Sequence, residues 1–125
     1  MGFAYLKWLL NNLNHVQKLK VHLRSGKHNQ TNHMIWRSLI DADFIQQYCL
    51  PDIINNIKDY HFDIYSYCQL SSIDIEKVIN SFQIHPLFLH RQWFNVKCFF
   101  NPIKSYQHLF STNNKSTQQL LVNLV

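Results

Sequence analysis

A chain of 125 residues can bury one hydrophobic core but not two, so we expect a single domain. Apolar residues make up 46% of it and aromatic residues 14%, which excludes a disordered chain, while 2 Gly and 3 Pro are too few for a many-stranded barrel or a phosphate-cradling glycine loop. The net charge of +5 is mildly basic and includes no run of five like charges, which argues against a basic tail.

The first predicted element is an amphipathic helix over about residues 4–14. Its apolar side chains recur at helical spacing. They are Tyr5, Leu6, Leu9, Leu10 and Leu13. The apolar run is too short to span a bilayer, Lys7 interrupts it, and no small-residue cleavage site follows. We therefore interpret it as a helix that packs on a core.

The stretch VQKLKVHL, residues 16–23, alternates apolar and polar side chains and predicts a strand over about 18–23. The same apolar spacing returns at residues 57–64 and 93–100, which predicts strands over about 59–66 and 95–100. The matching positions Leu19, Tyr60 and Val96 lie 41 and then 36 residues apart. The chain therefore contains three spaced copies of one strand pattern.

Helical patterns separate the strands and follow the last of them. One covers about residues 35–48 and is stopped by Pro51. The next covers about 73–83, begins at the capping sequence Ser71–Asp74, and ends before Pro86. A fourth helix is predicted over about 103–110, where Pro102 occupies a favourable first position.

This order predicts an α/β fold in which helical crossovers make the three strands parallel and adjacent. A sheet covered on both faces needs nearly continuous apolar strands, whereas these strands alternate. We therefore expect a short αβ solenoid of the leucine-rich-repeat type over residues 1–112, with all helices on one face. Residues 113–125 form a polar linker and an apolar tail, which is either the start of a truncated repeat or a helix covering the sheet edge.

The same alternation predicts the hydrophobic core. It contains one set of side chains from each strand and the apolar stripe of each helix. From the strands these are Leu19, Val21, Leu23, Tyr60, Phe62, Ile64, Val96, Cys98 and Phe100, and from the helices Leu9, Leu13, Leu39, Ile40, Ile75, Ile79 and Phe82.

Four stretches resemble the leucine-rich-repeat-like C-terminal regions of a large invertebrate family of F-box-type proteins. They are WLLNNLNHVQKLKVHL, IWRSLIDADFIQQYCLPD, DIEKVINSFQIHPLF and QWFNVKCFFNPIKSYQHLF. In that family an N-terminal F-box docks onto a ubiquitin-ligase scaffold and the repeats recruit a target. The resemblance therefore implies an adaptor that acts as the target-recruiting part of a ubiquitin-ligase receptor. The chain departs from the family in having no F-box and in repeats longer than the usual ~20–29 residues.

The outward side chains of the three strands are the predicted partner-binding site. If the strands pair in register, they form three columns. The columns are Lys20, His61 and Lys97; His22, Asp63 and Phe99; and Arg24, Tyr65 and Asn101, of which all but Asn101 are predicted to bind. Cations, imidazoles, one carboxylate and aromatic rings suit a polypeptide with acidic and apolar side chains. A solvated sheet face that binds nothing is the alternative.

Other functions have weaker support in the sequence. The eight histidines lack metal-ligand spacing, so we expect no metal or cofactor. For catalysis, His22 and Asp63 would need a nearby Ser or Cys, and we expect a non-enzymatic protein. The basic stretch from Lys18 to His28 makes nucleic acid the alternative partner. No membrane association is expected.

Three cysteines without a C-x-x-C pair indicate buried, reduced thiols in the cytoplasm or nucleus. The identity of the partner, the oligomeric state and the completeness of the chain stay open at this point.

Overall fold

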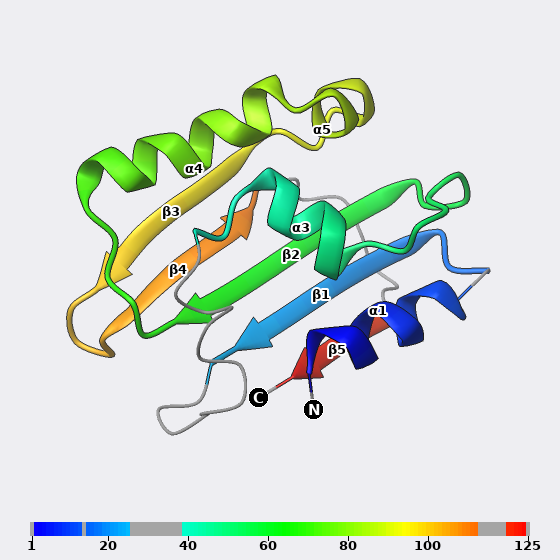
Figure 1. The fold of residues 1–125 in the computed structure, drawn as a ribbon, viewed down its shortest axis with the longest axis horizontal. Helices are drawn as coiled ribbons and strands as arrows, with labels where there is room; N and C mark the ends of the chain where they lie inside the picture. The colour runs from blue at the N-terminus through cyan, green and yellow to red at the C-terminus, as the bar shows by residue number, and fades with distance from the viewer. Residues whose placement is uncertain (1, 14, 26–38, 113–119, 125) are drawn as a thin grey trace.

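The computed structural model describes residues 2–13, 15–25, 39–112 and the backbone of 120–124. Four strands form an open mixed sheet in the order β3-β4-β2-β1, and a fifth, β5, pairs along the far side of β1. Their bounds are β1 Lys18–Arg24, β2 Asp59–Ser66, β3 Val96–Asn101, β4 Tyr106–Ser111 and β5 Leu120–Leu124. β1 is parallel to both β2 and β5, whereas β4 is antiparallel to both of its neighbours (Figure 1).

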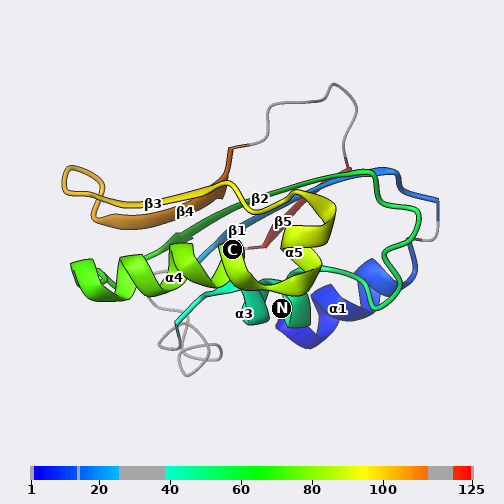
Figure 2. The ribbon, with the colours of Figure 1, turned by 90° about the horizontal axis from the view of Figure 1, so that it is seen from above.

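Four described helices cover one face of this sheet, as Figure 2 shows. They are α1 Phe3–Asn11, α3 Ala42–Cys49, α4 Ser72–Ile84 and α5 Pro86–Arg91. No helix in the described part of the chain is both long and apolar enough to cross a bilayer. Residues 35–38 of the second predicted helix and the linker 113–119 lie outside the described residues.

Local chemistry fixes where the helices begin. The Asp41 carboxylate accepts a hydrogen bond from Phe44 N and caps α3, and Ser71 Oγ does the same for Asp74 N at the start of α4. Pro86 then ends α4 and occupies the first turn of α5, where a missing N–H costs nothing. The predicted capping sequence at Ser71 is therefore confirmed.

The prediction of a three-stranded parallel solenoid is wrong. Residues 103–110, predicted as a helix, form a turn followed by β4, which runs antiparallel and lies between β2 and β3. The turn is held by Asn101 Oδ1, which accepts hydrogen bonds from the N–H groups of Ile103 and Lys104. In addition, the apolar tail residues 120–124 form β5 beside β1.

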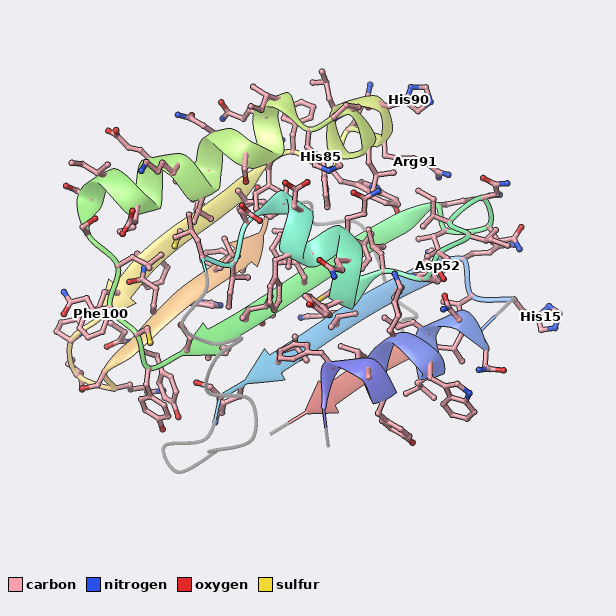
Figure 3. The ribbon with its side chains drawn as sticks, viewed as in Figure 1. His15, Asp52, His85, His90, Arg91 and Phe100 are labelled. Carbon is pink, nitrogen blue, oxygen red and sulfur yellow. The ribbon has the colours of Figure 1, made fainter. Side chains whose placement is uncertain are left out.

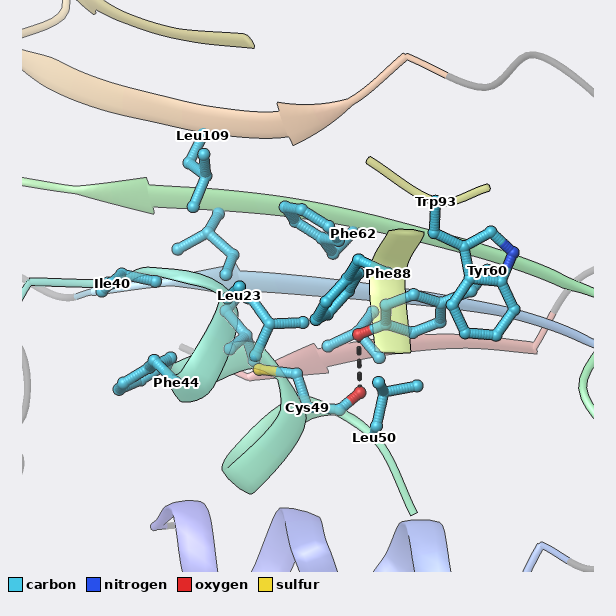
Figure 4. Close-up of a cluster of buried hydrophobic side chains, with 14 of the residues drawn as sticks. Leu23, Ile40, Phe44, Cys49, Leu50, Tyr60, Phe62, Phe88, Trp93 and Leu109 are labelled. Atoms are coloured by element: carbon cyan, nitrogen blue, oxygen red, sulfur yellow. Dashed lines mark hydrogen bonds between the residues drawn. The ribbon is translucent and has the colours of Figure 1, made fainter. Parts of the chain in front are cut away.

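The core lies between the sheet and the helices and is centred on β1 and β2. Tyr60 and Phe62 are buried, and the Tyr60 hydroxyl donates to the Cys49 carbonyl at 2.6 Å (Figure 4). Phe62 stacks on Phe82 of α4 with ring centroids 5.3 Å apart, which joins the sheet to the helical layer.

All predicted core positions on β1 and β2 are buried, but some predictions for other elements are wrong. Phe100, Ile75 and Ile79 are only half-buried and lie outside the core cluster. The expectation of three buried thiols is also wrong, because Cys68 is exposed and Cys98 half-buried, whereas Cys49 is buried. The partial exposure of Phe100 and Cys98 has one cause: β3 is an edge strand, so its helix-facing side chains are covered only in part.

Candidate functional site: the open face of the sheet

The candidate site is the sheet face opposite the helices, called here the open face. None of the four described helices lies on it (Figure 2). Because side chains alternate along a strand, β1 to β4 each place every second side chain there. These side chains include Lys20, His22, Arg24, His61, Asp63, Tyr65, Lys97, Phe99, Tyr106, His108 and Phe110.

The predicted pairing between the first two strands is confirmed. In the parallel register of β1 and β2, Lys20 is opposite His61, His22 is opposite Asp63, and Arg24 is opposite Tyr65. This register follows from the sequence, because a shift by one residue would turn the apolar set of either strand away from the helices.

The predicted third member of each column is misplaced, because β4 lies between β2 and β3. Lys97 is opposite Phe110, Phe99 is opposite His108, and Asn101 is opposite Tyr106. Lys97 and Phe99 therefore belong to the open face, but they are separated from β2 by the side chains of β4.

Asp63 is the electrostatic centre of the open face. His108 Nε2 donates a hydrogen bond to Asp63 Oδ1, and His22 Nδ1 lies 3.6 Å from Oδ2. Partial burial raises the pKa of Asp63, but the hydrogen bond from His108 and the attraction of His108, His22 and Lys20 outweigh burial, so the pKa is lowered overall. One carboxylate therefore orients two imidazoles from neighbouring strands.

A stack of rings extends from this centre toward the sheet edge. His108 lies between Tyr65 and Phe110, with ring centroids 4.1 Å and 4.3 Å away and interplanar angles of 10° and 24°. Phe99 meets both His108 and Phe110 edge to face at 5.5 Å and 5.8 Å. Such offset and edge-to-face contacts fix the rings in place. Phe99 nevertheless remains 46% exposed.

Arg24 lies at the other end of the stack, over Tyr65 and Tyr106. Its guanidinium lies 5.2 Å from the Tyr65 ring centroid and 5.4 Å from that of Tyr106. The Tyr106 hydroxyl shares a hydrogen bond of 2.6 Å with the Tyr67 hydroxyl, and this bond raises the pKa of Tyr67. Burial, followed by the nearby Asp63 carboxylate, raises the pKa of Tyr65. The Arg24 side chain is thus held over the rings while it stays exposed.

Sequence reasoning missed Tyr106, His108 and Phe110, all of which lie on β4. A helix over 103–110 would align Ile103, Tyr106, Leu109 and Phe110 in one apolar stripe, yet Ile103 is 92% exposed at the hairpin turn. In YQHLFS, residues 106–111, burial alternates along β4, but apolar and polar residue types do not. The sequence therefore carried no alternation signal for this strand, because buried Gln107 occupies a core-facing position and aromatic rings occupy the open-face positions.

Gln107 can be buried because its polar atoms are paired. Its Oε1 accepts a hydrogen bond from Leu70 N at 2.9 Å, and its Nε2 donates to Cys98 Sγ at 3.3 Å. Burial raises the pKa of Cys98 more than this hydrogen bond lowers it. A polar side chain therefore takes the place of an apolar one on the core side of β4.

The described residues contain no group of three or more His, Cys, Asp or Glu side chains arranged to hold a metal ion. Ser111 Oγ lies 3.4 Å from Nδ1 of His61, a different histidine from the two that contact Asp63. Absence of catalysis stays a prediction.

A hollow of about 450 Å³ lies beside the start of β2 and is lined in part by Lys58, His61 and Arg91. Arg91 has a structural role, because its guanidinium donates hydrogen bonds to the carbonyls of Ile54 and Ile57 and lies over the Trp93 ring. Of the basic stretch proposed for nucleic acid, Lys18, Lys20 and Arg24 lie on β1, while Lys27 and His28 are outside the described residues.

The open face thus combines a fixed aromatic stack with cations at both ends. Lys97 lies beside Phe110, Arg24 covers Tyr65, and the Asp63 carboxylate between them is held by two imidazoles. Comparison of the chain with family models, with curated proteins and with solved structures found no match.

Proposed function

We propose that this protein is a non-catalytic interaction module whose open face binds a polypeptide partner that carries acidic and apolar side chains. The observation that carries the proposal is Phe99, which is held edge to face against His108 and Phe110 and is still 46% exposed. A fixed aromatic ring loses little conformational freedom on binding, which favours it as an anchor.

The charges beside the rings support an acidic partner. Lys97 and Arg24 lie at the two ends of the aromatic stack, and Lys20 adds a third cation on β1. Asp63 accepts a hydrogen bond from His108 and lies 3.6 Å from His22, so its carboxylate is already engaged within the protein. A carboxylate that approaches the stack therefore meets mainly positive charge, which favours association through electrostatic complementarity.

Two further parts of the proposal rest on the sequence. The resemblance of four stretches to F-box-type proteins favours an adaptor that recruits a target to a ubiquitin ligase. The three free cysteines favour a reducing compartment, the cytoplasm or the nucleus.

Selection of peptides from a random displayed library against the immobilised protein tests the function. We expect the selected peptides to combine acidic residues with aromatic or aliphatic ones. A synthetic copy of such a peptide should bind Phe99→Ala roughly tenfold more weakly than the wild type, because loss of a central aromatic anchor commonly costs this much. Ile103→Ala is the matched control, since it truncates an exposed apolar side chain at the hairpin turn.

Two results would contradict the proposal. One is equal affinity of the selected peptides for the wild type and Phe99→Ala. The other is tight binding of random oligonucleotides that weakens steeply with salt and is lost in a Lys18/Lys20/Arg24 triple alanine variant, which would identify nucleic acid as the partner.

A further inference from the structure

β3 is the outer strand of the sheet, and its backbone presents a row of hydrogen-bonding groups outward. The Asn95 carbonyl accepts from Thr112 N at 2.9 Å, so Asn95 faces β4. Because backbone groups alternate in direction along an antiparallel strand, Lys97, Phe99 and Asn101 also face β4. The N–H and C=O groups of Val96, Cys98 and Phe100 therefore point away from the sheet, where no described strand lies beyond β3.

Helix α4 lies along this edge. It contacts β3, and Figure 1 shows it running along the outer side of that strand, while Figure 2 places it in the helical layer. The half-buried side chains Ile75 and Ile79 on α4 and Phe100 on β3 lie outside the core cluster. Figure 3 shows Phe100 projecting from β3 near this edge.

The position of α4 determines which kind of partner can pair with β3. A second folded copy pairing edge to edge would bring its own α4 against this one, because adjacent strands are only about 5 Å apart and packed helices need about 8–10 Å. A single extended segment needs no helical layer and fits beside β3 above α4. The site therefore suits a peptide and not a second copy of the chain.

We propose that an extended partner peptide adds to the sheet as an antiparallel strand beside β3. The peptide residues opposite Val96, Cys98 and Phe100 direct their side chains toward α4 and are apolar. The alternate residues direct theirs to the open face, where a carboxylate meets Lys97 and the methylene groups of a side chain meet Phe99. Backbone pairing supplies affinity in this mode and the alternating side chains supply selectivity. This inference rests on the proposed function and specifies how the partner binds.

A labelled peptide of alternating glutamate and valine, blocked at both ends, is the test probe. In the antiparallel arrangement the valine N–H groups face β3 and the glutamate N–H groups face solvent. N-methylation of the valines should weaken binding at least about tenfold, because several hydrogen bonds are lost together. N-methylation of the glutamates should leave affinity within about threefold. Fluorescence anisotropy gives each affinity.

Protein variants test the side-chain part of the proposal. Lys97→Glu should reverse the preference, so that a lysine–valine peptide binds better than the glutamate–valine peptide. Lys104→Glu, the same charge change in the exposed turn, should leave the preference of the wild type unchanged.

Failure of the glutamate–valine peptide to bind, or equal effects of the two methylations, overturns the pairing with β3. Sedimentation that shows a dimer of the wild type but not of Cys98→Pro would also overturn the proposal. A second copy of the chain would then occupy the outer edge of β3. If displayed peptides still depend on Phe99 while methylation has no directional effect, the proposed function stands and only the strand pairing is lost.

Discussion

Asp63 connects the stability of the fold to the candidate site. Its pKa is lowered in the folded state, so ionised Asp63 stabilises the protein at pH values above the ordinary pKa of 3.8. This contribution is lost as the pH falls through the lowered pKa, because the carboxyl group then binds a proton in both the folded and unfolded states. The stabilising effect of the two histidine contacts therefore requires the carboxylate form.

The variant Asp63→Asn removes this charge with little change in shape. We expect it to lower the free energy of unfolding by about 1 kcal/mol at pH 6, a value reduced for partial exposure. The difference from the wild type should shrink as the pH is lowered toward 3, and urea unfolding across this range measures it. Asp59→Asn, on the same face of the same strand, is the control. A difference that is constant with pH would contradict the argument.

At the scale of elements, the hairpin of β3 and β4 determines the character of the open face. It brings Tyr106, His108 and Phe110 beside Tyr65, whereas a helix over 103–110 would have left β2 adjacent to β3. Ser105 has φ of 59°, in the left-handed region that favours glycine. The hairpin therefore favours glycine at residue 105, whereas a helix would disfavour it.

The substitution Ser105→Gly distinguishes a hairpin from a helix at residues 103–110. In the hairpin, glycine should leave stability unchanged or raise it by up to about 1 kcal/mol, because the left-handed conformation carries no side-chain penalty. In a helix interior the same change would lower stability by roughly 0.5 kcal/mol. Thermal unfolding of Ser105→Gly and Ser105→Val gives the sign, with Ser105→Val expected to destabilise the hairpin. A Ser105→Gly variant less stable than the wild type would contradict the hairpin.

At the scale of the whole molecule, the sequence predicted half of the sheet well. β1 and β2 have apolar residues at every second position, and the helical connection between them favours a parallel pair from chain geometry alone. Their register and the His22–Asp63 contact follow from that pattern. The insertion of β4 could not be read in this way, because Gln107 replaces an apolar residue on its core side and aromatic rings occupy its other side.

Aromatic contacts indicate that the sheet and the helices unfold as one unit. Phe82 of α4 stacks on Phe62 of β2 and meets Phe88 of α5 edge to face with ring centroids 5.0 Å apart. Phe82 is fully buried, so its removal leaves a cavity shared by three elements. The consequence should therefore extend through the whole domain.

We expect Phe82→Ala to lower the free energy of unfolding by about 3–5 kcal/mol, from lost burial and the cavity that remains. Circular dichroism and tryptophan fluorescence should give coincident urea transitions for the wild type and the variant, since two-state unfolding couples the layers. Phe82→Leu retains most of the volume and should cost less, while Ile84→Ala, at a side chain that is 76% exposed, should be close to neutral. Separate transitions for the two probes would contradict the unfolding of the sheet and the helices as one unit.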